Sequence, residues 1–181
     1  MLPPIKAKSE LRRAAKEAVK SLSAEQRQSS SALIIKKILA LDIIKSARTV
    51  ALYASLPDEV ATAEALEALS TQKLVLLPRV EGDDMEFYPY NAATLERGAY
   101  GISEPQEGCA VMAEQIDVII VPGVVFTLTG KRIGRGKGYY DKYLSRKGFR
   151  ATKVGVCYGV QIAEDIDTEP HDIVMDYVIC D

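Results

Sequence analysis

A short segment in the second half of the chain has the composition of a phosphate-binding loop. Residues 130–138 read G-K-R-I-G-R-G-K-G, with four glycines and four cationic side chains, and two tyrosines and an aspartate follow at once. Glycine permits positive φ angles and lets the backbone approach a ligand closely, so that successive N–H groups can point at phosphate oxygens. Lys131, Arg132, Arg135 and Lys137 add formal charge. The segment therefore predicts a binding site for an anion.

The charge balance of the whole chain limits the kind of anion. The 181 residues include 23 Lys and Arg against 25 Asp and Glu, which gives a net charge of −2. Proteins that bind nucleic acid through its backbone usually carry a strongly basic surface. Because the cations are concentrated in one segment, we expect a small polyanion as ligand and no nucleic-acid partner.

Cysteine usage and hydropathy predict the environment of the protein. Cys109, Cys157 and Cys180 are far apart and form no C-x-x-C pattern, so neither a disulfide framework nor a zinc site is indicated. Residues 1–5 lack the apolar core of a signal peptide, and the longest uncharged stretch, residues 118–130, is only 13 residues long. We expect a cytoplasmic protein without a membrane partner.

Hydrophobic periodicity predicts the elements that hold the loop in place. Residues 7–22 and a stretch opening at the capping box Ser23 to Gln26 have helical spacing, and in the second of these we expect a buried side formed by Leu33, Ile34, Ile38 and Leu41. Further helices are expected over residues 62–69 and 139–147. Strands are expected over residues 49–53, 73–77 (ended by Pro78), 85–90 (an edge strand), 117–121, 152–158 and 174–180. This alternation predicts one α/β domain over residues 1–181, with a mainly parallel sheet between two helix layers.

The standard phosphate-binding motifs do not fit the loop. A P-loop ending at Gly136 and Lys137 requires glycine at position 131 and Ser or Thr at position 138, but Lys131 and Gly138 stand there. The dinucleotide pattern G-x-G-x-x-G, started at Gly134, meets Tyr139 where it needs glycine. The alternative to a binding loop is a flexible basic turn at the surface.

A longer segment around the loop resembles a known family. Residues 122–144 read P-G-V-V-F-T-L-T-G-K-R-I-G-R-G-K-G-Y-Y-D-K-Y-L, which resembles the hallmark segment of the 5-formyltetrahydrofolate cyclo-ligases, also called methenyltetrahydrofolate synthetases. Supporting motifs span nearly the full length: Lys8 with Arg12, Asp58-Glu59-Val-x-Thr62, Gly101-Ile-x-Glu104-Pro105, and His171-Asp172 with Asp176. The resemblance implies a ligase that uses ATP and Mg²⁺ to convert 5-formyltetrahydrofolate, with or without a polyglutamate tail, into 5,10-methenyltetrahydrofolate, ADP and phosphate.

The residue types suit that reaction. Phosphoryl transfer depends mainly on positioning and on neutralising charge, which N–H groups, Arg, Lys and Mg²⁺ can provide. Arg135 and Lys137 are the predicted catalytic residues. The predicted ATP-binding residues are Lys8, Arg12, Arg132, Gly134, Arg135, Gly136, Lys137, Gly138, Tyr139 and Tyr140. For Lys8 and Arg12 the alternative is a solvated helix face. For one of the two tyrosines, packing in the core explains the residue equally well.

For the folate, the resemblance implies Ala54, Glu59 and Tyr140 as binding residues. Glu59 follows the first predicted strand, at the edge where open α/β sheets bind ligands, and its carboxylate can accept hydrogen bonds from a pterin-type ring. The alternative for Glu59 is an ordinary loop acid. The apolar residues at 85, 87 and 88 could line the folate pocket, and packing of an edge strand explains them equally well.

Two aspartates are the predicted magnesium ligands. Asp141 lies in the first turn of its helix, where the helix dipole alone favours an acid, but a carboxylate beside a polyphosphate calls for an intervening cation. Asp176 is the second predicted ligand, although solvent-facing alternation in its strand explains it as well. His171, the only histidine, is expected to be structural rather than catalytic.

One residue departs from the family pattern. The family usually has aspartate directly after the phenylalanine, whereas this chain has Thr127, and this difference concerns how the loop is held. Two other functions remain open: a regulatory protein that binds ATP and folate without turnover, and a sugar-phosphate enzyme that uses the basic loop without ATP. We expect the protein to be a monomer or a weak dimer.

Overall fold

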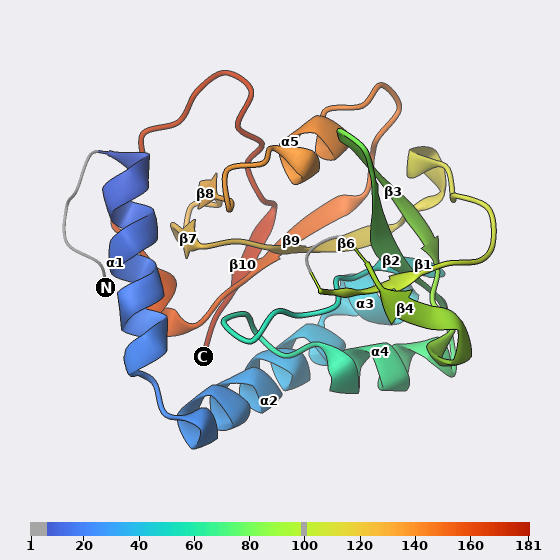
Figure 1. The fold of residues 1–181 in the computed structure, drawn as a ribbon, viewed down its shortest axis with the longest axis horizontal. Coiled ribbons are helices and arrows are strands. Elements are labelled where there is room, and N and C mark those ends of the chain that lie inside the picture. The colour runs from blue at the N-terminus through green and yellow to red at the C-terminus, as the bar shows by residue number, and fades with distance from the viewer. Residues whose placement is uncertain (1–6, 99–100) are drawn as a thin grey trace.

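The fold is built on a six-stranded sheet with helices on both faces (Figure 1). The computed structural model describes residues 7–98 and 101–181. The strands run in the order β10-β9-β6-β1-β2-β3, and all neighbours pair in parallel except β2 and β3. Their bounds are Thr49–Ala51 (β1), Leu74–Glu81 (β2), Asp84–Pro89 (β3), Val118–Pro122 (β6), Thr152–Val156 (β9) and Tyr177–Ile179 (β10). The predicted α/β class with a mainly parallel sheet is confirmed, and so is the edge position of β3.

Strand alternation divides the core between the two faces of the sheet. Val50, Val75 and Ile120 point into one cluster, while their neighbours Ala51 and Ile119 point into the other. The first cluster is covered by α2 (Ala24–Ala40), α3 (Asp42–Ser46) and α4 (Ala63–Ser70), and the second by α5 (Tyr139–Leu144). Both faces of β6 are therefore buried, which explains its continuous apolar sequence.

Two small antiparallel hairpins and three short 3₁₀ turns are further elements of the described residues. One hairpin pairs β4 (Leu95–Arg97) with β5 (Ser103–Pro105), and the other pairs β7 (Val125–Phe126) with β8 (Arg132–Ile133). The 3₁₀ turns are η1 (Ala92–Thr94), η2 (Ala113–Gln115) and η3 (Gly159–Gln161). The β7–β8 hairpin leads directly into the glycine loop, so its position fixes where that loop begins.

Helix α1 (Lys8–Ser21) lies beside the β7–β8 hairpin (Figure 1). Its buried side chains are Leu11, Ala15 and Val19, and the first two pack with Val125 of β7 in a separate small core. This packing holds the amino end of the chain against the glycine loop, although the two are more than a hundred residues apart in the sequence.

In α2 the predicted capping box between Ser23 and Gln26 is present in both directions. The predicted buried side is only partly correct, because Leu33 is 44% exposed and Ile35 takes its place in the core. Both residues are apolar and two positions apart, so the pattern alone does not show which side faces the sheet.

Strand β2 does not end before Pro78 as predicted. It continues to Glu81, with Pro78 opposite Phe87 of β3. The pairing of β2 with β1 stops at Leu76, so Pro78 lies where β2 has no ladder partner on its other side. Proline is tolerated where a strand borders no second ladder, because its missing N–H is not needed there.

None of the helices in residues 7–98 and 101–181 combines the length and the apolar character needed to cross a membrane.

Asp117 links the starts of two central strands, and we expect a measurable contribution from it to stability. Its Oδ2 atom accepts backbone hydrogen bonds from Arg48 (2.7 Å) and Thr49 (2.9 Å), and the bond from Thr49 is the main cause of the lowered pKa of this carboxyl. Asp117→Ala should lower the free energy of unfolding by about 1 kcal/mol at neutral pH, a value that allows for the exposure of the group.

The sign of the pH dependence follows from the lowered pKa. The ionised carboxylate stabilises the folded state fully above the unfolded pKa of about 3.9, and this contribution disappears as the pH falls through the folded value. Denaturant unfolding of both proteins at decreasing pH should show the difference shrinking. Asp42→Ala is the matched control, since its side chain is 98% exposed. A difference between wild type and Asp117→Ala that does not change with pH would contradict the assignment.

Candidate functional site

A cavity of about 770 Å³ opens at the carboxyl ends of the central strands. It is lined by residues that follow β1, such as Tyr53, by the second half of β2, by Pro122 at the end of β6, and by the loop between β8 and α5. Open α/β sheets bind ligands at this edge, and the volume lies in the range of pockets for small molecules and cofactors.

The cavity collects nearly all of the residues predicted from the sequence. Those that line it are Lys8, Arg12, Ala54, Glu59, Arg132, Gly134, Arg135, Gly136, Lys137, Gly138, Tyr139, Tyr140 and Asp141. They come from α1, from the segment after β1, and from the β8–α5 connection, so three distant stretches of sequence meet at one pocket.

Among the described residues, Asp176 is the one predicted site residue that does not line the cavity. Its Oδ2 atom accepts the backbone N–H of Lys153 at 2.7 Å and pairs with the Lys153 ammonium at 2.9 Å. These contacts lie at the amino ends of β9 and β10, opposite the edge that carries the pocket. The structure thus does not bring Asp176 together with Asp141, and the predicted pair of metal ligands is not assembled.

Glycines shape the loop between β8 and α5. Gly136 has φ +98° and Gly138 has φ +74°, a region of backbone conformation that favours glycine. A Cβ atom on Gly138 would meet no heavy atom within 4 Å, so the conformation rather than crowding favours glycine there. Arg12 supports the loop from α1, because its Nε donates to the carbonyl oxygen of Gly134 at 2.8 Å.

Arg132 lies beneath the loop with its side chain only 3% exposed. Its Nη1 donates to the Pro122 carbonyl oxygen at 3.3 Å, and its Nη2 lies 2.8 Å from Asp141 Oδ2 as an ion pair without hydrogen-bond alignment. Its Nε has no hydrogen-bond partner among the residues that the structure describes. A buried guanidinium with unused donors fits an anionic ligand.

Lys8 reaches the pocket from the start of α1. Its ammonium lies 2.8 Å from Glu169 and 2.7 Å from Asp172. Burial opposes its charge, but these two carboxylates outweigh that effect and raise the pKa of Lys8. His171 lies near the same acids with its side chain 72% exposed. Glu169, His171 and Asp172 have the types and spacing of metal ligands, but the Lys8 ammonium pairs with both acids.

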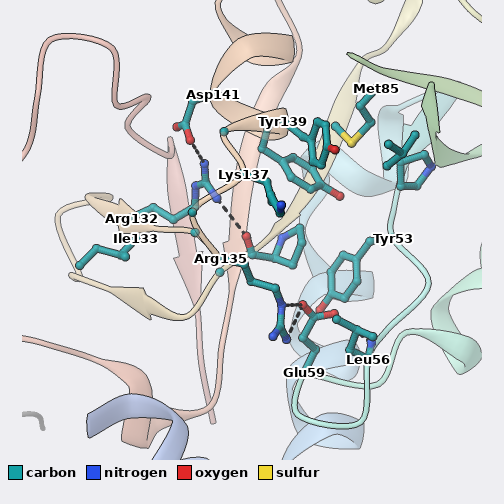
Figure 2. A pocket seen from close by; sticks show the side chains of 18 of the residues that line it. Tyr53, Leu56, Glu59, Met85, Arg132, Ile133, Arg135, Lys137, Tyr139 and Asp141 are labelled. Carbon is teal, nitrogen blue, oxygen red and sulfur yellow. Dashed lines mark hydrogen bonds and ion pairs between the residues drawn. The ribbon is translucent and has the colours of Figure 1, made fainter. Parts of the chain in front are cut away.

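The guanidinium of Arg135 is not free, because two carboxylates bind it. Its Nε and Nη2 both lie 3.0 Å from Glu59 Oε1 (Figure 2). Nη2 also lies 2.6 Å from Asp58 Oδ1. Burial opposes the charge, yet these carboxylates raise the pKa of Arg135. Lys137 is different, because no group in residues 7–98 or 101–181 forms a hydrogen bond or ion pair with its ammonium. The structure therefore distinguishes two cations that the sequence treated alike.

Glu59 is held firmly from its own side of the pocket. Its Oε2 atom accepts the backbone N–H of Leu56 at 2.9 Å, and its carbonyl oxygen accepts the hydroxyl of Tyr158 at 2.8 Å. Tyr158 is buried and lies 3.1 Å from the Ser31 hydroxyl of α2. No motif or spacing in the sequence marks Tyr158 and Ser31 as supports of Glu59, because they act through contacts between distant parts of the chain.

Tyr140, the second of the two adjacent tyrosines, has surroundings that serve both packing and binding. The hydroxyl of Tyr140 is buried and has no hydrogen-bond partner within the described parts of the chain. Burial, with a smaller effect of Glu59, raises its pKa far above the ordinary value, so the phenol stays neutral and can donate. The ring of Tyr140 meets Phe87 edge to face, with 6.5 Å between ring centroids. Tyr140 therefore combines core packing with a free donor at the cavity.

The β2–β3 hairpin contributes one of the three apolar residues considered for the folate. Met85 lines the cavity, whereas Phe87 is fully buried against Tyr143 and Tyr88 donates to Glu81. Glu104 belongs to one of the family-like motifs but is not among the predicted site residues. It lines the cavity, and burial raises the pKa of its carboxyl, opposed by a hydrogen bond from the Val80 backbone.

Thr127, the residue expected to depart from the family pattern, is built into the β7–β8 hairpin. It is buried at the turn of the β7–β8 hairpin, where its hydroxyl accepts the backbone N–H of Lys131 at 3.1 Å and lies 2.8 Å from the Thr129 hydroxyl. A hydroxyl can accept a backbone N–H as an aspartate would. The residue does not line the cavity, so its role is to hold the hairpin.

Together the fold and the site define an α/β protein with a cation-lined pocket beside a buried phenol and a carboxylate. The chain belongs to the 5-formyltetrahydrofolate cyclo-ligase family, whose model matches residues 4–181. The 5-formyltetrahydrofolate cyclo-ligase of Mus musculus is 30% identical over 188 residues, which cover 96% of this chain and 93% of that protein. The probable enzyme of Schizosaccharomyces pombe is 37% identical over 74% of each chain.

Solved structures agree with the family. The 5,10-methenyltetrahydrofolate synthetase of Aquifex aeolicus superposes with a TM-score of 0.87 at 38% identity, covering 96% of this chain and 89% of that one. The synthetase of Mycoplasma pneumoniae gives a TM-score of 0.76 at 28% identity, with 95% and 97% covered. The predicted family is confirmed, and the protein is a member of an enzyme family.

Proposed function

We propose that the protein closes the ring of 5-formyltetrahydrofolate at the expense of ATP, giving 5,10-methenyltetrahydrofolate, ADP and phosphate. The observation that supports this most directly is the assembly of the family-like loop, Lys8 and Arg12 of α1, and Glu59 around one cavity. The cavity offers cations and unused N–H donors together with a carboxylate and a neutral phenol. A polyphosphate and a pterin ring call for these two kinds of partner.

In the proposed reaction the formyl oxygen attacks the γ-phosphorus of ATP, and the bond from that phosphorus to the leaving ADP breaks. N10 of the folate then adds to the formyl carbon and loses its proton. The carbon–oxygen bond to the phosphate breaks, so that phosphate leaves and the C=N bond of the methenyl ring forms. Because N10 of the folate is itself the nucleophile, ring closure needs no side-chain nucleophile. Catalysis then consists of positioning and charge neutralisation.

The residues around the cavity divide between the two substrates. Lys8, Arg12, Arg132, Lys137 and the glycine backbone hold the phosphates, with Tyr139 at the start of α5 beside them. Lys137 is best placed to neutralise the moving phosphoryl group, because its ammonium is not engaged within the described chain. Arg135 can join it only after leaving its carboxylates. Ala54, Glu59 and Tyr140 hold the folate.

The residues present also fit a magnesium ion at Asp141. The carboxylate lines the cavity beside the loop, and it accepts the Ile173 backbone N–H at 3.2 Å in addition to its pair with Arg132. A carboxylate has further lone pairs for a cation, and Mg²⁺ usually takes one or two carboxylates with phosphate oxygens and water. When bound, the ion would neutralise phosphate charge. Because Asp176 lies elsewhere, the remaining ligands would come from phosphate and water.

Several expectations stay predictions. These are a single domain over residues 1–181, a monomer or weak dimer, acceptance of a polyglutamate tail, and a cytoplasmic location. The 5-formyltetrahydrofolate cyclo-ligase of Arabidopsis thaliana is named as mitochondrial, so location varies within the family. The regulatory alternative predicts tight ATP binding without turnover, with activity restored by Thr127→Asp; the structural role of Thr127 in the hairpin speaks against that restoration.

The proposed reaction has a direct test. Purified protein mixed with 5-formyltetrahydrofolate, ATP and Mg²⁺ should develop the near-ultraviolet absorbance of the methenyl product, and ADP should appear in equal amount. Omitting ATP should abolish both signals. Failure to form product above background, with protein shown to be folded, would refute the function and favour the regulatory alternative if ATP still binds.

Lys137→Ala should slow turnover more than it weakens folate binding. If Lys137 acts as a preorganised charge donor, its removal should raise the barrier by roughly 2 to 4 kcal/mol. Steady-state kinetics would show this as a fall in kcat with a smaller change in KM for the folate. Lys36→Ala on the exposed side of α2 removes the same charge away from the pocket and is the matched control. An unchanged kcat in Lys137→Ala would assign that residue to the surface.

Asp141→Asn should raise the magnesium concentration needed for half-maximal rate, because an amide oxygen is a weaker ligand than a carboxylate. Asp176→Asn is the control, and we expect no change in its magnesium requirement because Asp176 lies at the opposite edge of the sheet. The Asn variant also leaves buried Arg132 without its counter-ion, so its stability must be measured in parallel. A wild-type magnesium profile in folded Asp141→Asn would argue against the ligand assignment.

A further inference from the structure

Two residues with different proposed tasks are bound to each other in the pocket. Glu59 is the proposed folate-binding carboxylate, and Arg135 is a proposed phosphate-binding cation. Their side chains point at one another (Figure 2), with both Nε and Nη2 of Arg135 at 3.0 Å from Glu59 Oε1. The contact is largely shielded, since the Glu59 side chain is 10% exposed and that of Arg135 is 34% exposed. Arg135 thus occupies the carboxylate that the folate would use, and Glu59 occupies the guanidinium that the phosphates would use.

We propose that the contact of Arg135 with Glu59 and Asp58 is a latch that couples nucleotide binding to folate binding. The inference rests on the proposed function and goes beyond it. With the latch closed, Glu59 accepts hydrogen bonds from Arg135 and is not available to a pterin ring. A polyphosphate competes with the two carboxylates for the same guanidinium. Nucleotide binding therefore releases Glu59, and folate binding releases Arg135.

The structure indicates which partner moves. Glu59 is fixed by the Leu56 N–H at its carboxylate and by the Tyr158 hydroxyl at its carbonyl. Arg135 stands between Gly134 and Gly136, in a loop whose glycines lack side chains that would restrict rotation. Lys137, two residues further on, has no partner to hold it in the described chain. The guanidinium can therefore swing toward the phosphates while Glu59 stays in place.

Asp58 makes the closed state more favourable without being needed by either ligand. Its Oδ1 atom lies 2.6 Å from Arg135 Nη2, and its side chain is 44% exposed. It gives Arg135 a second carboxylate, so that Nη2 of the guanidinium is shared between the two acids. The ratio of closed to open latch then depends on Asp58, whereas the folate-binding group is Glu59.

This scheme makes a quantitative statement about affinity. If both ligands bind only the open state, the closed fraction weakens each by the same factor, and either ligand at saturation removes that factor for the other. A factor of about five is expected, at the lower end of the usual range of coupling between sites. The factor should appear for both ligands, which a purely structural role of the ion pair does not predict.

The test measures the dissociation constant of 5-formyltetrahydrofolate by calorimetry, with and without a saturating β,γ-imido analogue of ATP and Mg²⁺. Wild-type protein should bind the folate about fivefold more tightly with the analogue present. In Arg135→Ala the folate should bind equally well with and without the analogue, and as tightly as wild type binds it with the analogue.

Lys137→Ala is the matched control, because it removes one cation from the same loop but leaves the latch intact. It should keep the wild-type coupling factor, even if a lost charge weakens binding of both anionic ligands. Asp58→Asn should tighten the folate and the analogue, each measured alone, by one common factor and should reduce the coupling accordingly.

Two results would overturn the latch while leaving the proposed function intact: wild-type folate affinity that does not respond to the analogue, or an Arg135→Ala variant that keeps the wild-type factor. Absence of folate binding by every form of the protein would instead refute the proposed function, and the latch with it. The binding measurement needs no turnover, so the two failures are distinguishable.

Discussion

The crowding of positive charge at one pocket is the constraint on which the rest of the structure depends. Like charges in a partly buried site repel, and each cation needs a partner that can give way to a ligand. Lys8 is paired with Glu169 and Asp172, Arg132 with Asp141, and Arg135 with Asp58 and Glu59. Arg12 donates to a loop carbonyl. The protein itself thus supplies the partners of these cations, and on the proposed function an anionic ligand would compete for them.

These pairings connect the pocket to the whole architecture. The acids come from the segment after β1, from α5 and from the chain before β10, while the cations come from α1 and the glycine loop. Each pair therefore joins elements that are distant in the sequence. The parallel sheet makes this possible, because the carboxyl ends of β1 and β6 lie side by side. A ligand that replaced the carboxylates as partner of these cations would change contacts between several elements at once.

Thr127 shows how a side-chain hydroxyl helps to close the turn of the β7–β8 hairpin. The β7–β8 hairpin must deliver Arg132 to its buried position beside Asp141, and it does so through a turn closed by side-chain and backbone hydrogen bonds. The buried Thr127 hydroxyl contributes one of these bonds, because it accepts the backbone N–H of Lys131.

The sequence by itself determined the local features of the protein. Strand alternation, the capping box at Ser23 and the glycine loop follow from spacing and residue type, and the family-like motifs named most of the residues that the structure brings to the cavity. Only the tertiary structure decided the pairings. It placed Asp176 at the wrong edge for a ligand shared with Asp141, carried β2 through Pro78, and set Arg135 against Glu59. Periodicity reports which residues share one face of one element, whereas these outcomes depend on which elements meet, and that is fixed by packing between distant parts of the chain.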